Sequence, residues 1–253
     1  MATVQENILV VAVTILLSLL LMLGLNRIWP REKRLKYNDL IGWQLSVLGT
    51  TYAVILGFML YTVWTAYGEA ALNADLEASA VLNLYRLAGG LPDPERTQLQ
   101  TLARAYSDDV IHQEWPQMAQ GEFPQQSSPV TREMWTTIMS VKAVSPTEVN
   151  AQEQIMGQLE SLTQHRLTRI LQSRARLPNV LWCVLLVGGG LTIISACTFG
   201  SESIGLEMLQ VLSFSLLVSL SLVAIADIHR PFFGPIHVSE YAFQRTEQGM
   251  QTP

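Results

Sequence analysis

Long apolar runs alternate with polar segments along the chain, and four of these runs have the length of a bilayer-spanning helix. They cover Ile8–Leu25, Ser46–Tyr67, Asn179–Phe199 and Met208–Ala226. None of the four contains Asp, Glu, Lys or Arg. Because a helix needs about 20 mainly apolar residues to cross the hydrocarbon layer, the pattern predicts four transmembrane helices.

The second apolar run continues without a helix breaker into a charged, amphipathic segment. No proline occurs between Ser46 and Leu91, and proline is the residue that most often kinks or ends a helix. We therefore predict one long helix over Gly42–Gly90, with a length of roughly 65 Å. Pro92 and Pro94 follow it and mark its end.

The segment between the second and third spans is helical in pattern and predicts an extramembrane domain. Asp93-Pro94, Ser128-Pro129 and Ser145-Pro146 each place a capping residue before proline, as at a helix start. We expect the first of these helices to end near Pro116, and Glu148 completes a capping box for the last. No segment alternates with period two for long enough to predict a sheet.

The predicted fold class is therefore all-α, with four transmembrane helices and a helical extramembrane domain between spans two and three. The expected divisions are 1–67 (spans one and two with a basic connecting loop), 68–177 (helical extramembrane domain), 178–227 (spans three and four) and 228–253 (C-terminal tail).

Small residues mark two surfaces suited to close helix packing. Gly49, Ala53 and Gly57 recur at a spacing of four on one face of the second span. The third span carries Gly188, Gly189 and Gly190 in a row. Small side chains let two helix backbones approach closely inside a membrane, so we predict that these residues pack against other helices.

The opposite face of the long helix carries a stripe of hydroxyl-bearing residues that becomes acidic. Its members are Thr51, Phe58, Thr62, Thr65, Glu69, Asn73 and Glu77. In one interpretation the threonine hydroxyls bond their own backbone and the acids form a solvated face. In the other, the stripe lines a water-filled pore. The sequence leaves both interpretations open.

A short polar motif follows the fourth span, at the point where the chain leaves the membrane. It comprises Asp227, His229, Arg230, Pro231, Phe232 and Gly234. Proline ends the helix and the aromatic side chain anchors the exit at the interface, which favours a structural role. An ion-gating or pH-sensing cluster is the alternative.

Composition supports a multi-pass membrane protein and excludes several other classes. Hydrophobic residues make up 49% of the 253 residues, charged residues only 15%, and the net charge is −5. Nucleic acid is therefore not an expected partner. No phosphate loop, dinucleotide turn or nucleophile elbow is present, so we expect no enzyme and no cofactor.

The nearest approach to a metal site is a helical cluster of Asp108, Asp109, His112 and Glu114, which we interpret as a solvated face without metal. Both cysteines, Cys183 and Cys197, lie in the third span and are expected to act as small apolar side chains.

The charges that flank the spans give conflicting signs for membrane orientation. The loop after the first span carries Arg27, Arg31, Lys33, Arg34 and Lys36, which favours a cytoplasmic location for that loop. The arginines before the third span favour a cytoplasmic location for the extramembrane domain instead. With four spans, these two regions lie on opposite sides.

Three signatures, in this order and spacing, resemble the bacterial bestrophin-like family. The first is Gly57-Phe58 through Glu69-Ala70, with Glu77-Ala78, Leu84-Tyr85-Arg86 and Leu91-Pro92 after it. The second is Arg176-Leu177-Pro178 with Trp182. The third is Asp227 followed by Pro231-Phe232-Phe233-Gly234.

The resemblance implies four spans, a helical domain between spans two and three, and a ring-shaped homo-oligomer, a pentamer by analogy. Bestrophins are ion channels in which span two lines the pore and the helical domain is cytosolic. By the same analogy we expect the bacterial inner membrane, with the domain in the cytoplasm. The acidic calcium clasp of regulated bestrophins is not found, and Phe58 is the one candidate for their aromatic neck.

Three functions follow as hypotheses. The first is a homo-oligomeric channel for small ions, with an acidic exit that favours cations. The second is a non-conducting scaffold or accessory protein that binds a partner through its helical domain. The third is a proton-driven transporter, which requires an ionisable group within the membrane, and Asp227 is the nearest candidate.

Overall fold

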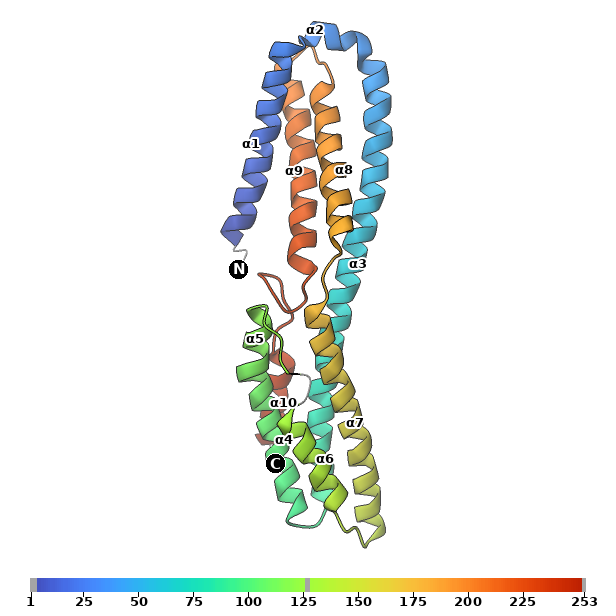
Figure 1. Cartoon of the computed structure of the whole chain (residues 1–253), viewed down its shortest axis with the longest axis vertical. Coiled ribbons are helices and arrows are strands. Elements are labelled where there is room, and N and C mark those ends of the chain that lie inside the picture. The colour runs from blue at the N-terminus through green and yellow to red at the C-terminus, as the bar shows by residue number, and fades with distance from the viewer. Residues whose placement is uncertain (1–3, 126–127, 252–253) are drawn as a thin grey trace. The chain divides into compact units, whose positions relative to one another are not determined.

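A computed structural model describes residues 4–125 and 128–251, and this part of the chain is helical without any strand (Figure 1). Its helices are α1 (Val4–Ile28), α2 (Arg31–Arg34), η1 (Leu35–Tyr37), α3 (Asn38–Leu87), η2 (Ala88–Gly90), α4 (Glu95–Asp109), the π-helical turn η3 (Val110–Glu114), α5 (Trp115–Ala119), α6 (Pro129–Ser140), α7 (Pro146–Arg174), α8 (Asn179–Thr198), α9 (Ile204–Ile228) and α10 (Tyr241–Gln251). The predicted all-α class is confirmed.

Four helical segments are long and apolar enough to cross a membrane, and they match the four predicted runs, except that the third helix ends at Thr198, one residue before Phe199. The long helix is also present as predicted: α3 runs unbroken for 50 residues and begins four residues before Gly42. The absence of proline inside it is the local reason for its continuity.

The chain divides into two compact units, and α3 contributes to both. The first, which we call the membrane unit, comprises residues 1–65 and 176–229. In it α1 packs along α9, and both contact α8 (Figure 1). The long helix α3 meets α8 through side chains. Tyr52 bridges the two helices, and its hydroxyl donates to the Leu185 carbonyl at 2.9 Å.

The second unit, which we call the helical unit, comprises residues 66–175 and 230–253. The second half of α3 packs there with α4, α6 and α7 around a core that includes Leu84, Leu99, Ile138 and Leu159. The segment after residue 228 is not a separate tail within the described residues. It returns to this core, where the side chain of Phe243 on α10 is buried.

Two of the predicted helix starts have the expected caps. The Ser128 side chain accepts from the Thr131 amide, and Ser145 forms a capping box with Glu148. The third start differs from the prediction. Pro94 itself is the N-cap of α4, and the Asp93 carboxylate accepts from the side chains of Arg96 and Thr97 instead of a backbone amide.

The predicted helix end near Pro116 is also wrong, because the helical path continues to Ala119. Proline lacks an amide hydrogen, so it fits where an interior helical bond is not required. Here the π-helical turn η3 widens the helix just before Pro116, which then occupies the first turn of α5. The wide turn thus accommodates the proline without ending the helix.

Candidate functional site

The first part of the predicted polar stripe lies on a face of α3 that the rest of the subunit leaves uncovered. Thr51, Phe58, Thr62 and Glu69 are exposed and Thr65 is half-buried, with 70% of the Phe58 surface accessible. The Thr62 hydroxyl donates to the Phe58 carbonyl at 2.8 Å, so this hydroxyl bonds its own helix. The face is therefore free to meet water, lipid or another subunit.

Asn73 and Glu77 depart from the predicted stripe, and the structure corrects their assignment. Both are buried in the helical unit, with Glu77 fully inaccessible. The Asn73 side chain donates to the His165 backbone carbonyl at 2.8 Å, and its Oδ1 lies 2.8 Å from Nδ1 of the His165 ring. A residue covered by its own subunit cannot line a water-filled pore, so the exposed stripe ends at Glu69.

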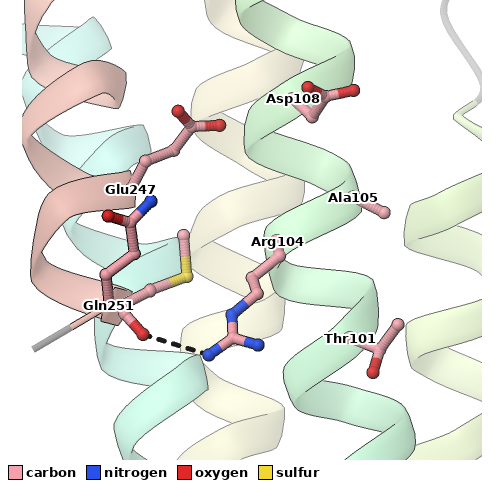
Figure 2. Close-up of a pocket in the computed structure, with 7 residues that line it drawn as sticks. Thr101, Arg104, Ala105, Asp108, Glu247 and Gln251 are labelled. Carbon is pink, nitrogen blue, oxygen red and sulfur yellow. Dashed lines mark hydrogen bonds between the residues drawn. The ribbon is translucent and has the colours of Figure 1, made fainter. Parts of the chain in front are cut away.

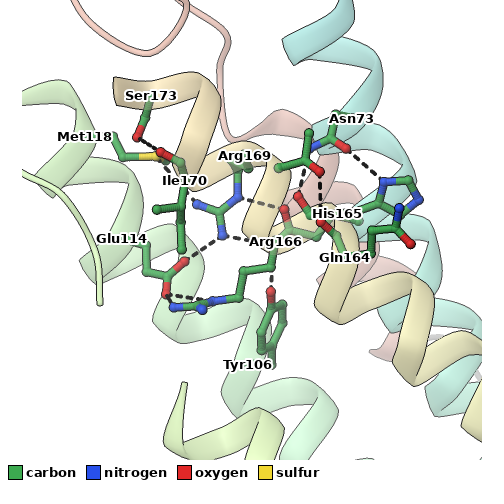
Figure 3. Close-up of polar contacts among 12 residues, drawn as sticks. Asn73, Tyr106, Glu114, Met118, Gln164, His165, Arg166, Arg169, Ile170 and Ser173 are labelled. Atoms are coloured by element: carbon green, nitrogen blue, oxygen red, sulfur yellow. Dashed lines mark hydrogen bonds and ion pairs between the residues drawn. The ribbon is translucent and has the colours of Figure 1, made fainter. Parts of the chain in front are cut away.

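Glu77 belongs instead to a buried cluster of two carboxylates and two guanidinium groups. Figure 3 labels its other charged members, Glu114, Arg166 and Arg169. Arg169 on α7 donates to Glu77 at 2.7 and 2.9 Å and to Glu114 at 2.6 Å. Arg166, one turn earlier, donates to Glu114 from two nitrogens. The Tyr106 hydroxyl donates to Glu77 at 2.6 Å. We call these five residues the ion cluster, and it joins α3, α4, η3 and α7.

The electrostatic surroundings favour the ionised forms of Glu114 and Arg169. Burial alone raises the pKa of Glu114, but the charges of Arg169 and Arg166 outweigh it and hold that pKa below its ordinary value. Burial disfavours the Arg169 cation, yet Glu77 and Glu114 raise the pKa of Arg169 well above normal. Burial, followed by the Glu77 charge, raises the pKa of Tyr106, which stays a neutral donor. The cluster therefore stabilises the packing of α3, α4, η3 and α7 against one another.

Sequence reasoning missed this cluster although a signal was present. On α7, Arg166 and Arg169 fall on the same face as Leu159, Leu162 and Ile170, at helical spacings of three and four. Arginine at core positions of an amphipathic helix indicates a buried ion pair, because an unpaired buried charge is too costly.

The acidic helix face that was interpreted as solvated is only partly so. Asp108 and His112 are exposed, with 3.5 Å between His112 Nε2 and Asp108 Oδ1, whereas Glu114 is buried in the ion cluster. Among the described residues, no group of three His, Cys, Asp or Glu side chains could hold a metal ion.

Asp109 gives a pH-dependent prediction. Burial and then the Glu114 charge raise the pKa of Asp109 above its ordinary value. A carboxyl whose pKa is higher in the folded state loses stabilisation as pH rises through that pKa. Asp109→Asn should therefore stabilise the helical unit at pH 7 and leave it unchanged at pH 3, as judged by thermal unfolding. The exposed neighbour Asp108 provides the control, and an equal gain from Asp108→Asn would contradict the prediction.

A cavity of about 410 Å³ lies between α4 and α10, lined by residues that include Thr101, Asp108 and Glu247 (Figure 2). Arg104 reaches across it and donates to the Met250 carbonyl at 3.1 Å. Its guanidinium thereby caps the last turn of α10, where free carbonyls favour a cation. The contact explains how α10 is held, and it indicates no ligand.

The small residues of the two spans have different surroundings. A Cβ atom at Gly188 would lie 2.6 Å from the Tyr52 ring, and one at Gly189 would lie 2.8 Å from the Tyr52 hydroxyl. Gly49, Gly57 and Gly190 have nothing within 4 Å of the same position, and Ala53 is exposed. Gly188 and Gly189 thus allow Tyr52 to approach, while Gly49, Ala53, Gly57 and Gly190 do not pack within the subunit.

The membrane-exit motif begins with contacts inside the membrane unit. The Asp227 carboxylate accepts from the Asn7 side chain at 2.6 Å and so ties α9 to the start of α1. The His229 ring meets Trp182 edge-on, with ring centroids 5.6 Å apart. These contacts fit the structural interpretation of the motif.

The remainder of the motif forms a turn within the helical unit. Arg230 lies over the Phe233 ring, and Phe232 packs edge-on against Trp115. Gly234 has a φ of +101°, in the left-handed region that only glycine enters readily. The turn therefore depends on glycine at this position.

A second buried ion pair, also missed by sequence reasoning, lies in the membrane unit. Arg34 donates to Glu207 at 2.7 Å and to the Cys197 carbonyl at 2.6 Å, and both charged side chains are buried. Asn26 contacts both members of the pair. The pair connects the α1–α3 loop to the end of α8, where Cys197 lies, and to the start of α9, where Glu207 lies.

Comparison with known proteins gives one family and one fold. A family model described as a Bestrophin-like domain matches residues 12–243. The crystal structure of a point mutant of a bacterial bestrophin homologue from Klebsiella pneumoniae superposes with a TM-score of 0.72 at 14% identity, covering 97% of this chain and 99% of that one. A structure of a bacterial bestrophin homologue from the same organism, phased by Zn-SAD, gives 0.61 at 13% identity over 96% of each chain. No curated protein is significantly similar.

Proposed function

The chain belongs to the bestrophin-like family, and from this premise we propose that it forms a homo-oligomeric ion channel with a pore lined by α3. A ring of subunits, five by analogy with the family, would place the same face of each α3 around a central axis. The proposal requires that this face be available for such an axis.

The observation that carries the proposal is the uncovered face of α3 in the membrane unit. Thr51, Phe58 and Thr62 occupy it with hydroxyls and one aromatic ring. A monomer in lipid gains nothing from exposing hydroxyls along a span, whereas a pore uses them as hydrogen-bonding groups for hydrated ions. Phe58, the aromatic side chain of the predicted stripe, is the proposed constriction.

Glu69→Gln tests the pore assignment. The Glu69 carboxylate is exposed on the same helix after the apolar segment, and in a ring it would attract cations. A unit charge about 4 Å from an ion in water contributes about 1 kcal/mol, or roughly fivefold in relative occupancy. We expect Glu69→Gln to lower cation preference by a few-fold in reversal-potential measurements on planar bilayers.

The exposed Glu160 on α7 provides the matched control, and Glu160→Gln should leave the reversal potential unchanged. Folded, oligomeric protein that does not conduct, or equal effects of the two substitutions, would refute the channel proposal.

The alternative is a non-conducting scaffold that binds a partner through its helical unit. One observation favours it: the exposed face of α3 carries no charged side chain between Thr51 and Thr65, so no part of that face requires water. Recovery of a single partner at fixed stoichiometry, together with silent bilayers, would support this function.

We also propose that the chain lies in the bacterial inner membrane with its helical unit in the cytoplasm. Four arginines precede the third span. Arg166 and Arg169 belong to the ion cluster, whereas Arg174 and Arg176 are exposed. Single cysteines at Lys33 and Lys142, on a Cys183→Ala background, test the orientation. An impermeant maleimide applied to whole spheroplasts should label the first site and not the second.

A further inference from the structure

Two cavities lie between α3 and α8 in the membrane unit, and we call them together the furrow. Its first cavity, of about 330 Å³, is lined by apolar side chains from both helices, among them Ile55, Val187 and Leu191. Gly188 and Tyr52, which lie in close contact, also line it. The cavity has the character of the surrounding hydrocarbon, and it contains no charged group.

A second cavity, of about 460 Å³, lies between the same two helices, nearer the α1–α3 loop. Its lining is amphipathic, with Trp29, Tyr37, Gln44, Ser195 and Thr198 among its residues. The Trp29 and Tyr37 rings pack with centroids 6.1 Å apart. Indole and phenol groups prefer the depth at which lipid headgroups meet the acyl chains.

The loop that borders this second cavity is basic. Arg27 and Arg31 flank Trp29 in the chain. Lys36 directly precedes Tyr37, and Lys33 lies between Trp29 and Tyr37. Lys33 and Lys36 are exposed. Against these four cations stand two carboxylates, Glu32 and Asp39, and Arg34 is neutralised separately by Glu207. The loop that supplies Trp29 and Tyr37 to the second cavity therefore carries net positive charge.

We propose that the furrow binds one membrane phospholipid with an anionic headgroup. The order of surfaces along α3 and α8 is apolar, then amphipathic, then basic, which matches the order of acyl chain, ester region and phosphate in such a lipid. A transmembrane helix of a second copy would fit the apolar cavity but would leave the basic loop without a counter-charge. Thr51 lies on the proposed pore face and also at the edge of the first cavity, so the lipid would lie beside that face; the proposal concerns lipid binding and does not require conduction.

Binding can be measured by native mass spectrometry of delipidated protein titrated with phosphatidylglycerol or phosphatidylcholine. We expect one tightly held phosphatidylglycerol per subunit and weaker binding of phosphatidylcholine. Lys33→Glu combined with Lys36→Glu should weaken phosphatidylglycerol binding on the order of tenfold or more, since each basic group near an anionic lipid contributes about 1 kcal/mol. Val187→Trp, which fills the apolar cavity, should weaken binding of both lipids by roughly tenfold.

Two exposed positions outside the furrow provide matched controls. Val180→Trp adds the same bulk elsewhere on α8, and Lys142→Glu changes the same charge in the helical unit; neither should alter binding. Equal affinity for the two lipids, or equal effects of Val187→Trp and Val180→Trp, would overturn the proposal.

Cys183 gives a second readout on the unmodified chain, because it is exposed and lines the furrow whereas Cys197 is buried. Phosphatidylglycerol should slow maleimide labelling of Cys183 in delipidated protein. Unchanged labelling, or efficient cross-linking of Cys183 to a neighbouring subunit in the presence of lipid, would assign the furrow to a second copy and refute the lipid site.

Discussion

Replacing Arg169 with glutamine should destabilise the helical unit by about 3–5 kcal/mol, the usual cost of removing one partner from a buried ion pair. Arg169 is fully buried and is the partner that contacts both carboxylates of the ion cluster. Without it, Glu77 keeps only the Tyr106 hydroxyl among its cluster contacts. Because whole domains are stable by only about 5–15 kcal/mol, this change should lower the unfolding temperature markedly in circular dichroism.

The exposed Arg86 is the control, and Arg86→Gln should change stability by no more than about 0.5 kcal/mol. A double-mutant cycle with Glu77→Gln and Arg169→Met separates the pair energy from the loss of either side chain. The double variant should be more stable than the sum of the single changes predicts. Equal unfolding temperatures for Arg169→Gln and Arg86→Gln would show that the cluster does not stabilise the unit.

Gly188→Ala should destabilise the membrane unit by about 1–3 kcal/mol, the range for overpacking a tight contact. The added methyl group would lie 2.6 Å from the Tyr52 ring, so α8 and α3 must separate or the ring must move. The Tyr52 hydroxyl would then lose its bond to the Leu185 carbonyl. Heating in detergent followed by size-exclusion chromatography measures the loss of folded protein.

Gly190 lies two residues further on and has open space at the same position, so Gly190→Ala should be tolerated. Tyr52→Ala should relieve the effect of Gly188→Ala, because it removes the ring that the methyl group meets. If both glycine substitutions behave alike, helix propensity rather than the Tyr52 contact determines the outcome.

The sequence was sufficient for features that depend on local signals. Apolar runs without charge located the spans, the absence of proline predicted the length of α3, and Ser-Pro pairs located the starts of α6 and α7. Each of these is decided by residues within one or two helical turns of each other.

The buried position of Glu77 could not be read from α3 alone. A helical wheel gives the direction of a side chain around one helix but not which other helix covers that direction. Here the covering charge comes from Arg169, on a helix distant in the chain. Two local hints existed: Glu77 lies among Ala70, Ala74 and Ala78, a stripe suited to close packing, and Arg169 lies on the apolar face of α7.

The Arg34–Glu207 pair escaped prediction for a different reason. The charge of Glu207 excludes this residue from the predicted fourth run, which begins at Met208. The helix α9 nevertheless begins at Ile204 and includes Glu207. Its partner Arg34 lies in a loop with four other basic residues and is not distinguished from them by the sequence. Neither residue shows by itself that the other is near.

The π-helical turn η3 determines the direction, around the helix axis, in which the side chains that follow it point. At 100° per residue, the nine residues from Tyr106 to Trp115 would turn the two side chains to about opposite sides of an α-helix. Both rings instead contact the ring of Phe243. The extra width of the turn thus acts as a built-in one-residue insertion. Ordinary α-helical geometry over the same residues would rotate Glu114 by about 100° and away from Arg169, whereas deletion of one residue within the turn would preserve the direction of Glu114. Loss of the wide turn without a compensating deletion would therefore disrupt the ion cluster as surely as a charge substitution, with all five of its side chains still present.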